Sequence, residues 1–405
     1  MIKNLLSRPC PICSNNKAEI LHTQKFIIPD GYPLPEFYDV VCCSRCGFTY
    51  ADTPVTQKDY DLYYRDFSKY EDPNTATGSG ISSWDRKRFQ TIASEVGKFI
   101  PDKHSSIVDI GCANGGLLGE LNRLGYLNLS GIDPSETCIN YIKGKYNISR
   151  AIVGGLFSQS IIADKSLQKS FDCVVLSGVL EHIYNVQQAI KNVSNLLKNG
   201  GCLYIEVPDA SHYDNYYVVP YYYFDSEHIN HFDRFSLKNL LNMNGFEFLL
   251  YNEKGTPVSK FNIYPSVFVM GKKVDIKTSG FVLAPDYTAK NSIIAYIQKS
   301  KATEDSINNQ IQPLVNCQRP IIIWGAGNYT MRLLKDSPLG KCNIIGFIDN
   351  DSKKWGKTIK GIPVSPPVKL EKLEGTIVIC AALYGDDILA QIKTMDVNNK
   401  VILLK

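Results

Sequence analysis

SSIVDIGCANGGLLGELNRLGY, residues 105–126, is the stretch that decides the fold. It reads as a strand over 105–110, a glycine turn, and a helix that begins near Leu117. The following segment, NLSGIDPS, reads as a second strand that ends in Asp133. This order predicts a β-α-β unit, and therefore an α/β fold with a parallel sheet.

The turn of this unit has the features of a ligand-binding loop. Gly111, Gly115 and Gly116 allow the backbone to approach a ligand closely. Asp133, about twenty residues further on, stands where a carboxylate accepts hydrogen bonds from both ribose hydroxyls. Glycine-rich turns also bind dinucleotides, but here Asp109 precedes the turn. An acid at that position repels phosphate and suits a cationic ligand.

This arrangement resembles the class I S-adenosylmethionine-dependent methyltransferases. FDCVVLSGVLEHI (171–183) and GGCLYIEVPD (200–209) are similar to the fourth and fifth strands of that fold, and FEFLLYNE with PSVFVMGKK to its closing hairpin. The resemblance implies S-adenosylmethionine as cofactor and a Rossmann-like sheet. The donor-binding residues that it implies are Asp109, Gly111, Asn114, Gly115, Asp133, Leu156, Phe157 and Ser177, with Leu156 and Phe157 beside the adenine.

Two C-x-x-C pairs lie near the N-terminus. Cys10 and Cys13 form the first, and Cys43 and Cys46 form the second, roughly thirty residues later. Four thiolates on two tight turns predict a closed, tetrahedral, structural Zn²⁺ site. Cys42 and His22 are weaker candidates, because neither fits the paired spacing.

The last third of the chain predicts a second, smaller α/β unit. A polar, helix-like connector at 290–315 leads into RPIIIWGAGNYTMRLL, NIIGFIDNDSKKWGKTIKGIPV, GTIVICAAL and KVILLK. The Gly325-Ala-Gly327 turn and Asp349 would by themselves suggest a dinucleotide site, but the third glycine is missing. We interpret this unit as Rossmann-like, without a second cofactor, and as surface for substrate binding.

The order of the three blocks resembles the sugar C-methyltransferases of deoxysugar biosynthesis. That family methylates carbon 3 of 4-keto-deoxysugar nucleotides, so the resemblance implies a nucleotide-linked sugar as the substrate. It also carries a Glu-His segment after the fifth strand, which Glu227-His228 matches. The chain departs from the family at Asp225, where a tyrosine is common.

Glu227 and His228 belong to YYYFDSEHINHF (221–232), which fits neither strand nor helix periodicity. Abstraction of a proton beside a ketone needs a base and donors to the enolate oxygen. We expect His228 to be that base and Glu227 to orient it. The expected donors are His182 and a tyrosine, either Tyr223 or one from the first linker, Tyr64 or Tyr70. The alternative is that His228 and His231 only support a packed aromatic loop.

Composition narrows the class of protein. With 44% hydrophobic and 21% charged residues over 405 positions, the chain is globular and long enough for two or three domains. A net charge of +4 without a dense basic block argues against a nucleic-acid partner. No signal peptide and no long apolar run is evident, so we expect no membrane partner and a cytoplasmic location. We expect a monomer or dimer.

The predicted domains are a zinc-binding domain (1–75), a methyltransferase domain (76–275) and a Rossmann-like substrate-binding domain (276–405). Three other functions stay open at this level. One is O-methylation of a sugar or glycan hydroxyl. The second is a nicotinamide-dependent oxidoreductase built on the third block, and the third is a zinc-organised binding protein without catalysis.

Overall fold

The computed structural model describes residues 2–28, 31–67, 78–146, 148, 150–274, 282–395 and 397–405. The chain divides into two compact units. The first consists of residues 1–215, 224–257 and 264–294, and the second of 216–223, 258–263 and 295–405. Both predicted domain boundaries, near 75 and 275, fall outside the described residues, so the division into three domains stays a prediction.

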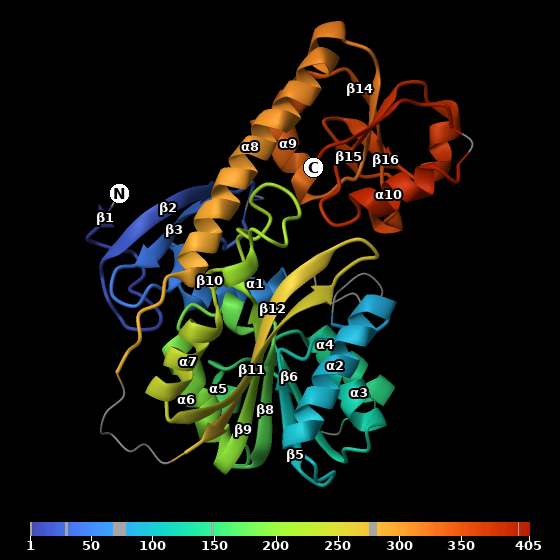
Figure 1. Ribbon diagram of the computed structural model, residues 1–405. Helices are drawn as coiled ribbons and strands as arrows, with labels where there is room; N and C mark the ends of the chain where they lie inside the picture. The colour runs from blue at the N-terminus through green and yellow to red at the C-terminus, as the bar shows by residue number, and fades with distance from the viewer. Residues whose placement is uncertain are drawn as a thin grey trace. The chain divides into compact units, whose positions relative to one another are not determined.

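The centre of the first unit is a seven-stranded sheet with the order β11-β12-β9-β8-β5-β6-β7 (Figure 1). β5, β6, β7, β8 and β9 pair with one another in parallel, and β12 is antiparallel to β9. The predicted α/β fold and the closing hairpin are therefore confirmed. The strands are β5 (Ser106–Ile110), β6 (Asn128–Asp133), β7 (Arg150–Val153), β8 (Phe171–Ser177), β9 (Leu197–Pro208), β11 (Phe246–Pro257) and β12 (Ile263–Lys273).

Helices of this unit connect the strands and cover the sheet (Figure 1). They are α2 (Ser83–Phe99), α3 (Gly116–Arg123), α4 (Glu136–Tyr146), α5 (Gln159–Ile162), α6 (Val186–Leu196) and α7 (Arg234–Met243), with the 3₁₀ turns η2 (Leu180–His182) and η3 (Ala210–His212). The predicted strand, glycine turn and helix of residues 105–126 are thus present as β5, a turn, and α3.

The sheet has an apolar core on each face, because side chains alternate along a strand. Val108 and Ile110 of β5 join one core, which includes residues of α6 and α7. Ile107 joins the other core, together with residues of α2, α3 and α4. Burial on both faces explains why the parallel strands read as nearly continuous apolar runs in the sequence.

A second sheet of the first unit has the order β1-β2-β3-β4-β10. Its strands are β1 (Ile2–Lys3), β2 (Ala18–Lys25), β3 (Phe37–Cys43), β4 (Thr49–Asp52) and β10 (Asn230–His231), and helix α1 (Gln57–Asp66) follows β4. β10 comes from the stretch 221–232 and pairs with β4, with His231 opposite Thr49. This stretch therefore joins the N-terminal sheet to the loops that follow β9.

The second unit contains a sheet with the order β15-β16-β14-β13-β17-β18. β13, β14, β16, β17 and β18 pair in parallel, which is the second α/β sheet expected from the sequence. Its elements are the carboxyl-terminal part of α8 (Thr288–Cys317), β13 (Ile321–Trp324), α9 (Asn328–Asp336), η4 (Pro338–Lys341), β14 (Ile344–Ile348), η5 (Ser352–Lys354), β15 (Thr358–Ile359), β16 (Ile362–Ser365), η6 (Pro367–Lys372), β17 (Thr376–Ile379), α10 (Gly385–Ile392) and β18 (Val401–Leu403).

The helices of the described ranges include none with the length and apolar character needed to cross a membrane. The twelve cysteines are all free thiols, and ten are buried. This agrees with the interpretation that the scattered cysteines are reduced core residues.

Candidate active site and metal centre

The glycine turn after β5 has a backbone that only glycine adopts readily. Gly111 and Gly115 have φ angles of 74° and 75°. A Cβ atom on Gly111 would lie 2.7 Å from Cγ2 of Val179. The loop that follows β8 therefore packs directly on this turn, and a side chain at position 111 would force the two apart.

Asp133, at the end of β6, closes the same turn. Its Oδ2 accepts a hydrogen bond from the backbone N–H of Ala113 (2.8 Å), and its Oδ1 accepts one from Ser135 (2.9 Å). Its carbonyl accepts the N–H of Gly154 (2.9 Å), which begins the loop that carries the buried Leu156. Phe157 is half-buried beside the same core. The predicted ribose and adenine neighbours are thus adjacent in the fold.

Asp109 gives the turn its electrostatic character. Its side chain is buried, and burial, with the nearby charge of Asp133, raises its pKa to about 8. A cationic ligand would favour the ionised form of this carboxylate. The pair of acids therefore favours a cationic ligand over a pyrophosphate at this turn.

Two further predicted donor-site residues lie in different surroundings. Asn114 is buried within the turn. Ser177, at the end of β8, accepts a hydrogen bond from Arg88 Nη2 (2.8 Å) and donates one to Glu206 Oε2 (3.0 Å). Arg88 also pairs with Glu206 (3.2 Å). The hydroxyl of Ser177 thus belongs to a buried ionic network at the carboxyl edge of the sheet.

Glu227 lies within a group of tyrosines from α1. Tyr63 donates a hydrogen bond to Oε1 of Glu227 (2.9 Å), and Tyr64 donates one to Oε2 (3.3 Å). The partners are 164 and 163 residues apart in the sequence. Tyr64 was predicted near the site, whereas Tyr63 was missed. The spacing of Tyr60, Tyr63 and Tyr64, which share one helical face, was the available signal.

The carboxylate of Asp225 lies beside the ring of His228. Its Oδ2 lies 3.8 Å from Nδ1 of His228. Its Oδ1 accepts the backbone N–H groups of Glu227 (2.8 Å) and His228 (2.7 Å). These two bonds hold the Asp225 carboxylate beside the ring. The position at which the chain departs from the sugar C-methyltransferase pattern is therefore the one that faces the predicted base.

His182 is held in a defined tautomer. Its Nδ1 lies 3.1 Å from the carbonyl oxygen of Glu227. A carbonyl only accepts, so Nδ1 carries the proton and Nε2 carries the lone pair. Burial lowers the pKa of His182, which favours this neutral form. A neutral His182 does not donate from Nε2, so the predicted role as donor to an enolate does not suit this tautomer. Its ring lies 4.8 Å from that of His228.

The other predicted aromatic and histidine residues lie elsewhere. His231 is fully buried, and burial lowers its pKa to about 3. Tyr223 belongs to the second unit, where its hydroxyl donates to the carbonyl of Tyr216 and its N–H to the hydroxyl of Tyr296. Tyr70 lies outside the described residues.

Arg8 connects the loops that carry these groups. It is buried, and burial lowers its pKa to about 10. Its guanidinium donates to the carbonyls of Tyr184 (2.6 Å) and Ile229 (3.0 Å) and to Oδ1 of Asn230 (2.8 Å). One side chain thus joins the loop after His182 to the loop after His228.

The four predicted zinc ligands converge. Sγ of Cys10 lies 3.6 Å from that of Cys46, and Sγ of Cys13 lies 3.5 Å from that of Cys43. All four sulfur atoms lie within 4.8 Å of one another. A tetrahedron with Zn–S bonds of about 2.3 Å has edges of about 3.8 Å. The sulfur atoms therefore fit a zinc ion.

The two turns that present these thiols have the same form. The N–H of Ser14 donates to the carbonyl of Cys10 (2.9 Å), and the N–H of Gly47 to that of Cys43 (3.0 Å). The φ angle of Gly47 is 81°. The weaker candidates point elsewhere, since Cys42 donates to the carbonyl of Gly47 (3.3 Å) and His22 stacks on Phe224.

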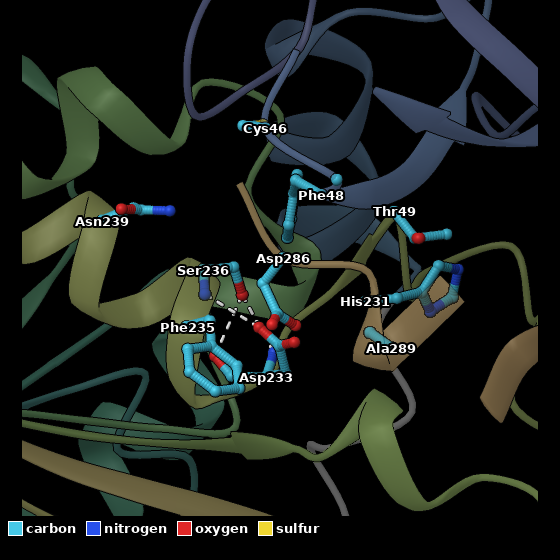
Figure 2. A pocket seen from close by; sticks show the side chains of 11 residues that line it. Cys46, Phe48, Thr49, His231, Asp233, Phe235, Ser236, Asn239, Asp286 and Ala289 are labelled. Atoms are coloured by element: carbon cyan, nitrogen blue, oxygen red, sulfur yellow. Dashed lines mark hydrogen bonds between the residues drawn. The ribbon is translucent and has the colours of Figure 1, made fainter. Parts of the chain in front are cut away.

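A small pocket of about 220 Å³ lies between this cysteine turn and α7 (Figure 2). Figure 2 shows the carboxylates of Asp233 and Asp286 directed toward each other on one side of it. Burial raises the pKa of Asp233 to about 6, and Asp286 adds to the rise. Neither the glycine turn nor His228 lines this pocket. It is therefore distinct from the candidate active site.

The fold and the acid-glycine turn define a class of protein. A family described as "Methyltransferase domain" matches residues 84–251. This match identifies residues 84–251 as a methyltransferase domain. A second family, described as "C2185-like, N-terminal", matches residues 317–403.

Among individual proteins, the chain is similar to ubiquinone biosynthesis O-methyltransferases. The protein of Coxiella burnetii is 31% identical over 102 residues, which are 25% of this chain and 43% of that protein. The mitochondrial protein of Dictyostelium discoideum is 30% identical over 124 residues, 26% of this chain and 36% of that one. The chain thus matches less than half the length of these relatives.

Solved structures of methyltransferases are also similar. The 1,6-didemethyltoxoflavin-N1-methyltransferase of Burkholderia thailandensis is 15% identical, with 57% of this chain and 97% of that chain covered and a TM-score of 0.39. The magnesium protoporphyrin IX methyltransferase of Synechocystis is 14% identical, with 54% and 96% covered and a TM-score of 0.38.

Proposed function

We propose that the protein is an S-adenosylmethionine-dependent methyltransferase that methylates carbon 3 of a nucleotide-linked 4-keto-deoxysugar. One observation carries the proposal. The loop after β8 packs on the donor turn through Val179 and Gly111, and three residues later it supplies His182, whose ring faces that of His228. This proximity of two imidazole rings to the predicted donor turn supports the proposal that one of them acts as a base for a carbon acid.

The donor is proposed to bind along the carboxyl edge of β5, β6 and β8. S-adenosylmethionine supplies an electrophilic methyl group when it is bound. Asp109, Gly111, Asn114 and Gly115 would hold its methionine part, and Asp133 would accept hydrogen bonds from its ribose. The nonpolar contacts to adenine would come from Leu156 and Phe157, with Ser177 at the strand end.

The chain's own residues supply the acid–base chemistry. Nε2 of His228 would take the proton from carbon 3, and the electron pair of the broken C–H bond would pass to the ketone oxygen as an enolate. The carboxylate of Asp225 would favour the imidazolium that forms. Tyr64, whose bond to Glu227 is the longer one at 3.3 Å, is the tyrosine we propose to turn toward the enolate oxygen.

The roles of the two neighbouring residues follow from their contacts. Glu227 would position the tyrosines, because its two oxygens accept their hydroxyl groups. His182 would either position the ring of His228 or act as the base itself, since its Nε2 carries a lone pair. Variants at 182 and 228 separate these two assignments.

A second candidate is O-methylation of a hydroxyl group. The names of the relatives from Coxiella burnetii and Dictyostelium discoideum favour it. The same base would then deprotonate an oxygen, and no ketone would be required.

Hydrogen exchange tests the proposal. The protein is incubated in heavy water with a panel of 4-keto-deoxysugar nucleotides, with and without the methyl donor. We expect loss of the carbon 3 proton by NMR, and a C-methyl product when the donor is present. A product methylated on oxygen, with no exchange at carbon, would establish the second candidate instead.

We further propose that Cys10, Cys13, Cys43 and Cys46 bind one structural Zn²⁺. Four thiolates leave no open coordination position, so the metal would stabilise the N-terminal sheet without taking part in methyl transfer. We propose the second unit as the surface for the nucleotide-linked substrate, in a protein that is a monomer or dimer.

A further inference from the structure

A cluster of three potential metal ligands lies outside the residues used so far. Asp209 follows β9 directly, His212 ends the 3₁₀ turn η3, and Glu253 lies on β11. Nε2 of His212 is 3.9 Å from Oδ2 of Asp209 and 3.6 Å from Oε2 of Glu253. The ligand atoms all lie within 4.8 Å of one another.

Asp209 is the residue that points to a ligand. It is fully buried. Its Oδ1 accepts hydrogen bonds from the N–H (3.0 Å) and the hydroxyl (2.5 Å) of Ser211. Its Oδ2 is buried too and accepts no hydrogen bond from the described residues. Burial accordingly raises the pKa of this carboxyl. Ligating carboxylates are commonly fixed in this way, through the oxygen that does not bind the metal.

The other two groups complete an accessible site. The side chains of His212 and Glu253 are 36% and 27% exposed, so an ion can enter. Arg234 pairs with the second oxygen of Glu253 (3.3 Å), and this leaves Oε2 directed at His212. Two carboxylates and one guanidinium give the cluster one net negative charge, which favours a cation.

The three ligand atoms would have to move slightly closer together to bind one metal ion. Ligand atoms about 2.0–2.2 Å from a metal lie about 3.0–3.5 Å from one another. The side chains of His212 and Glu253 are partly exposed and can close the difference by rotation. Metal binding at Nε2 also places a proton on Nδ1 of His212. Asn215, whose side-chain nitrogen lies 3.5 Å from Nδ1, would then turn its amide oxygen toward it.

We propose that Asp209, His212 and Glu253 bind a divalent cation of the Mn²⁺, Fe²⁺ or Zn²⁺ class. Two oxygen ligands and one imidazole are the donor set that such ions accept. Three protein ligands leave coordination positions for water or for the oxygen atoms of a substrate. The site lies at the carboxyl edge of the parallel sheet, three residues beyond Glu206, which pairs with Ser177 of β8.

Titration of the full chain with MnCl₂ tests the proposal. Mn²⁺ binds poorly to thiolates, so it reports on this site while zinc occupies the cysteines. Free Mn²⁺ is measured by the amplitude of its six-line EPR signal. We expect one bound ion per chain. His212→Ala and Glu253→Gln should each weaken binding by more than about tenfold, because loss of even an outer-shell partner costs about 10–100-fold.

His182→Ala is the matched control, since it alters the other histidine–carboxylate cluster, Glu181, His182 and His228. It should bind Mn²⁺ normally. Thermal melting without Mn²⁺ checks that each variant folds, and Mn²⁺ should raise the melting temperature of the unaltered protein and of His182→Ala only. Full binding by His212→Ala and Glu253→Gln, or no binding by the unaltered protein, would overturn the proposal. Loss of binding in His182→Ala alone would do the same.

Discussion

Two β-α-β units in this chain close their turns in the same way. In the first unit, Asp133 accepts one N–H from the glycine turn and one from the residue two positions after itself. In the second, Asp349 accepts the N–H of Ala326 (2.7 Å) and that of Asp351 (2.8 Å). An acid after the second strand is therefore part of the turn's own structure, and its presence does not identify a ligand.

The units differ in what surrounds that acid. Lys354 lies 3.0 Å from Oδ2 of Asp349 and neutralises it. Ile323, which is fully buried, stands two residues before the turn glycine, where the first unit has Asp109. All six histidines lie between positions 22 and 231. The second turn thus lacks both the charge for a cationic donor and a base near it in sequence.

The largest expected effect concerns the proposed zinc site, whose four cysteines all lie in the first unit. Cys13→Ser should remove the zinc and lower the stability of that unit severely, because structural zinc contributes about 10–16 kcal/mol of folding free energy in small zinc domains. Elemental analysis gives the zinc content, and calorimetry gives the unfolding transitions.

Cys317→Ser is the matched control, because Cys317 is an exposed thiol of the second unit. It should keep about one zinc per chain and normal unfolding. Full zinc content in Cys13→Ser would refute the assignment of the four ligands.

The next effect concerns the base. His228→Ala should reduce turnover by roughly a hundredfold to ten-thousandfold with donor binding intact, the range for loss of a positioned general base. His104→Ala, an exposed position, should be normal. Steady-state kinetics with the methyl acceptor, and calorimetry with S-adenosylhomocysteine, measure the two quantities. Normal turnover in His228→Ala with an inactive His182→Ala would move the base to His182.

The carboxylates beside His228 give a smaller effect. Asp225→Asn should slow turnover, because its carboxylate lies 3.8 Å from Nδ1 of His228 and accepts the backbone N–H groups of Glu227 and His228. Glu227→Gln should slow turnover through a different contact, since its oxygens hold Tyr63 and Tyr64. Steady-state kinetics measure both effects, and normal turnover in Asp225→Asn would show that Asp225 does not act on the ring.

The acids that close the two turns, Asp133 and Asp349, should differ in their effect on donor binding. Asp133→Ala should weaken S-adenosylhomocysteine binding by about 1.5–3 kcal/mol, which is roughly 10–150-fold, through loss of a charged acceptor for the ribose. Asp349→Ala should leave this affinity unchanged. Calorimetry with NAD should detect no binding to the unaltered protein. Tight NAD binding that is lost in Asp349→Ala would show that the second turn also binds a nucleotide cofactor.

The smallest expected effect concerns Asp109, whose pKa is raised to about 8. The free site is therefore mostly protonated at pH 6 to 7, whereas the positive charge of the donor favours the ionised carboxylate. Binding then releases a proton, and affinity should rise several-fold, at most about tenfold, from pH 7 to pH 8. Asp109→Asn should abolish this part of the dependence, while ionisation of the donor's own amino group affects both proteins equally.

Much of the fold could be predicted from short patterns. The strand, turn and helix of residues 105–126 are present within a residue or two of the expected bounds, and the two C-x-x-C pairs converge as expected. Such features depend on neighbours within one turn or strand, where periodicity and the positive φ of glycine act directly.

The partners within the candidate active site could not be predicted in this way. Residues 227 and 228 are adjacent in sequence, so pairing them was the simplest interpretation. In the structure the backbone directs Glu227 to Tyr63 and Tyr64, and it is Asp225, three residues before His228, that approaches the ring. The departure from the family pattern at 225 was noticed in the sequence, but its role was not.

The sequence by itself determined the α/β class, the acid-glycine turn and the cysteine pairs, because each is encoded by residues close together in the chain. Only the tertiary structure decided the tautomer of His182, the carboxylate that faces His228, and the meeting of Asp209 and His212 with Glu253. These contacts join residues as much as 45 positions apart in the sequence. Their geometry depends on how the loops after β8 and β9 are held. Arg8, near the N-terminus, contributes to this because its guanidinium donates to Tyr184 in one loop and to Ile229 and Asn230 in the other.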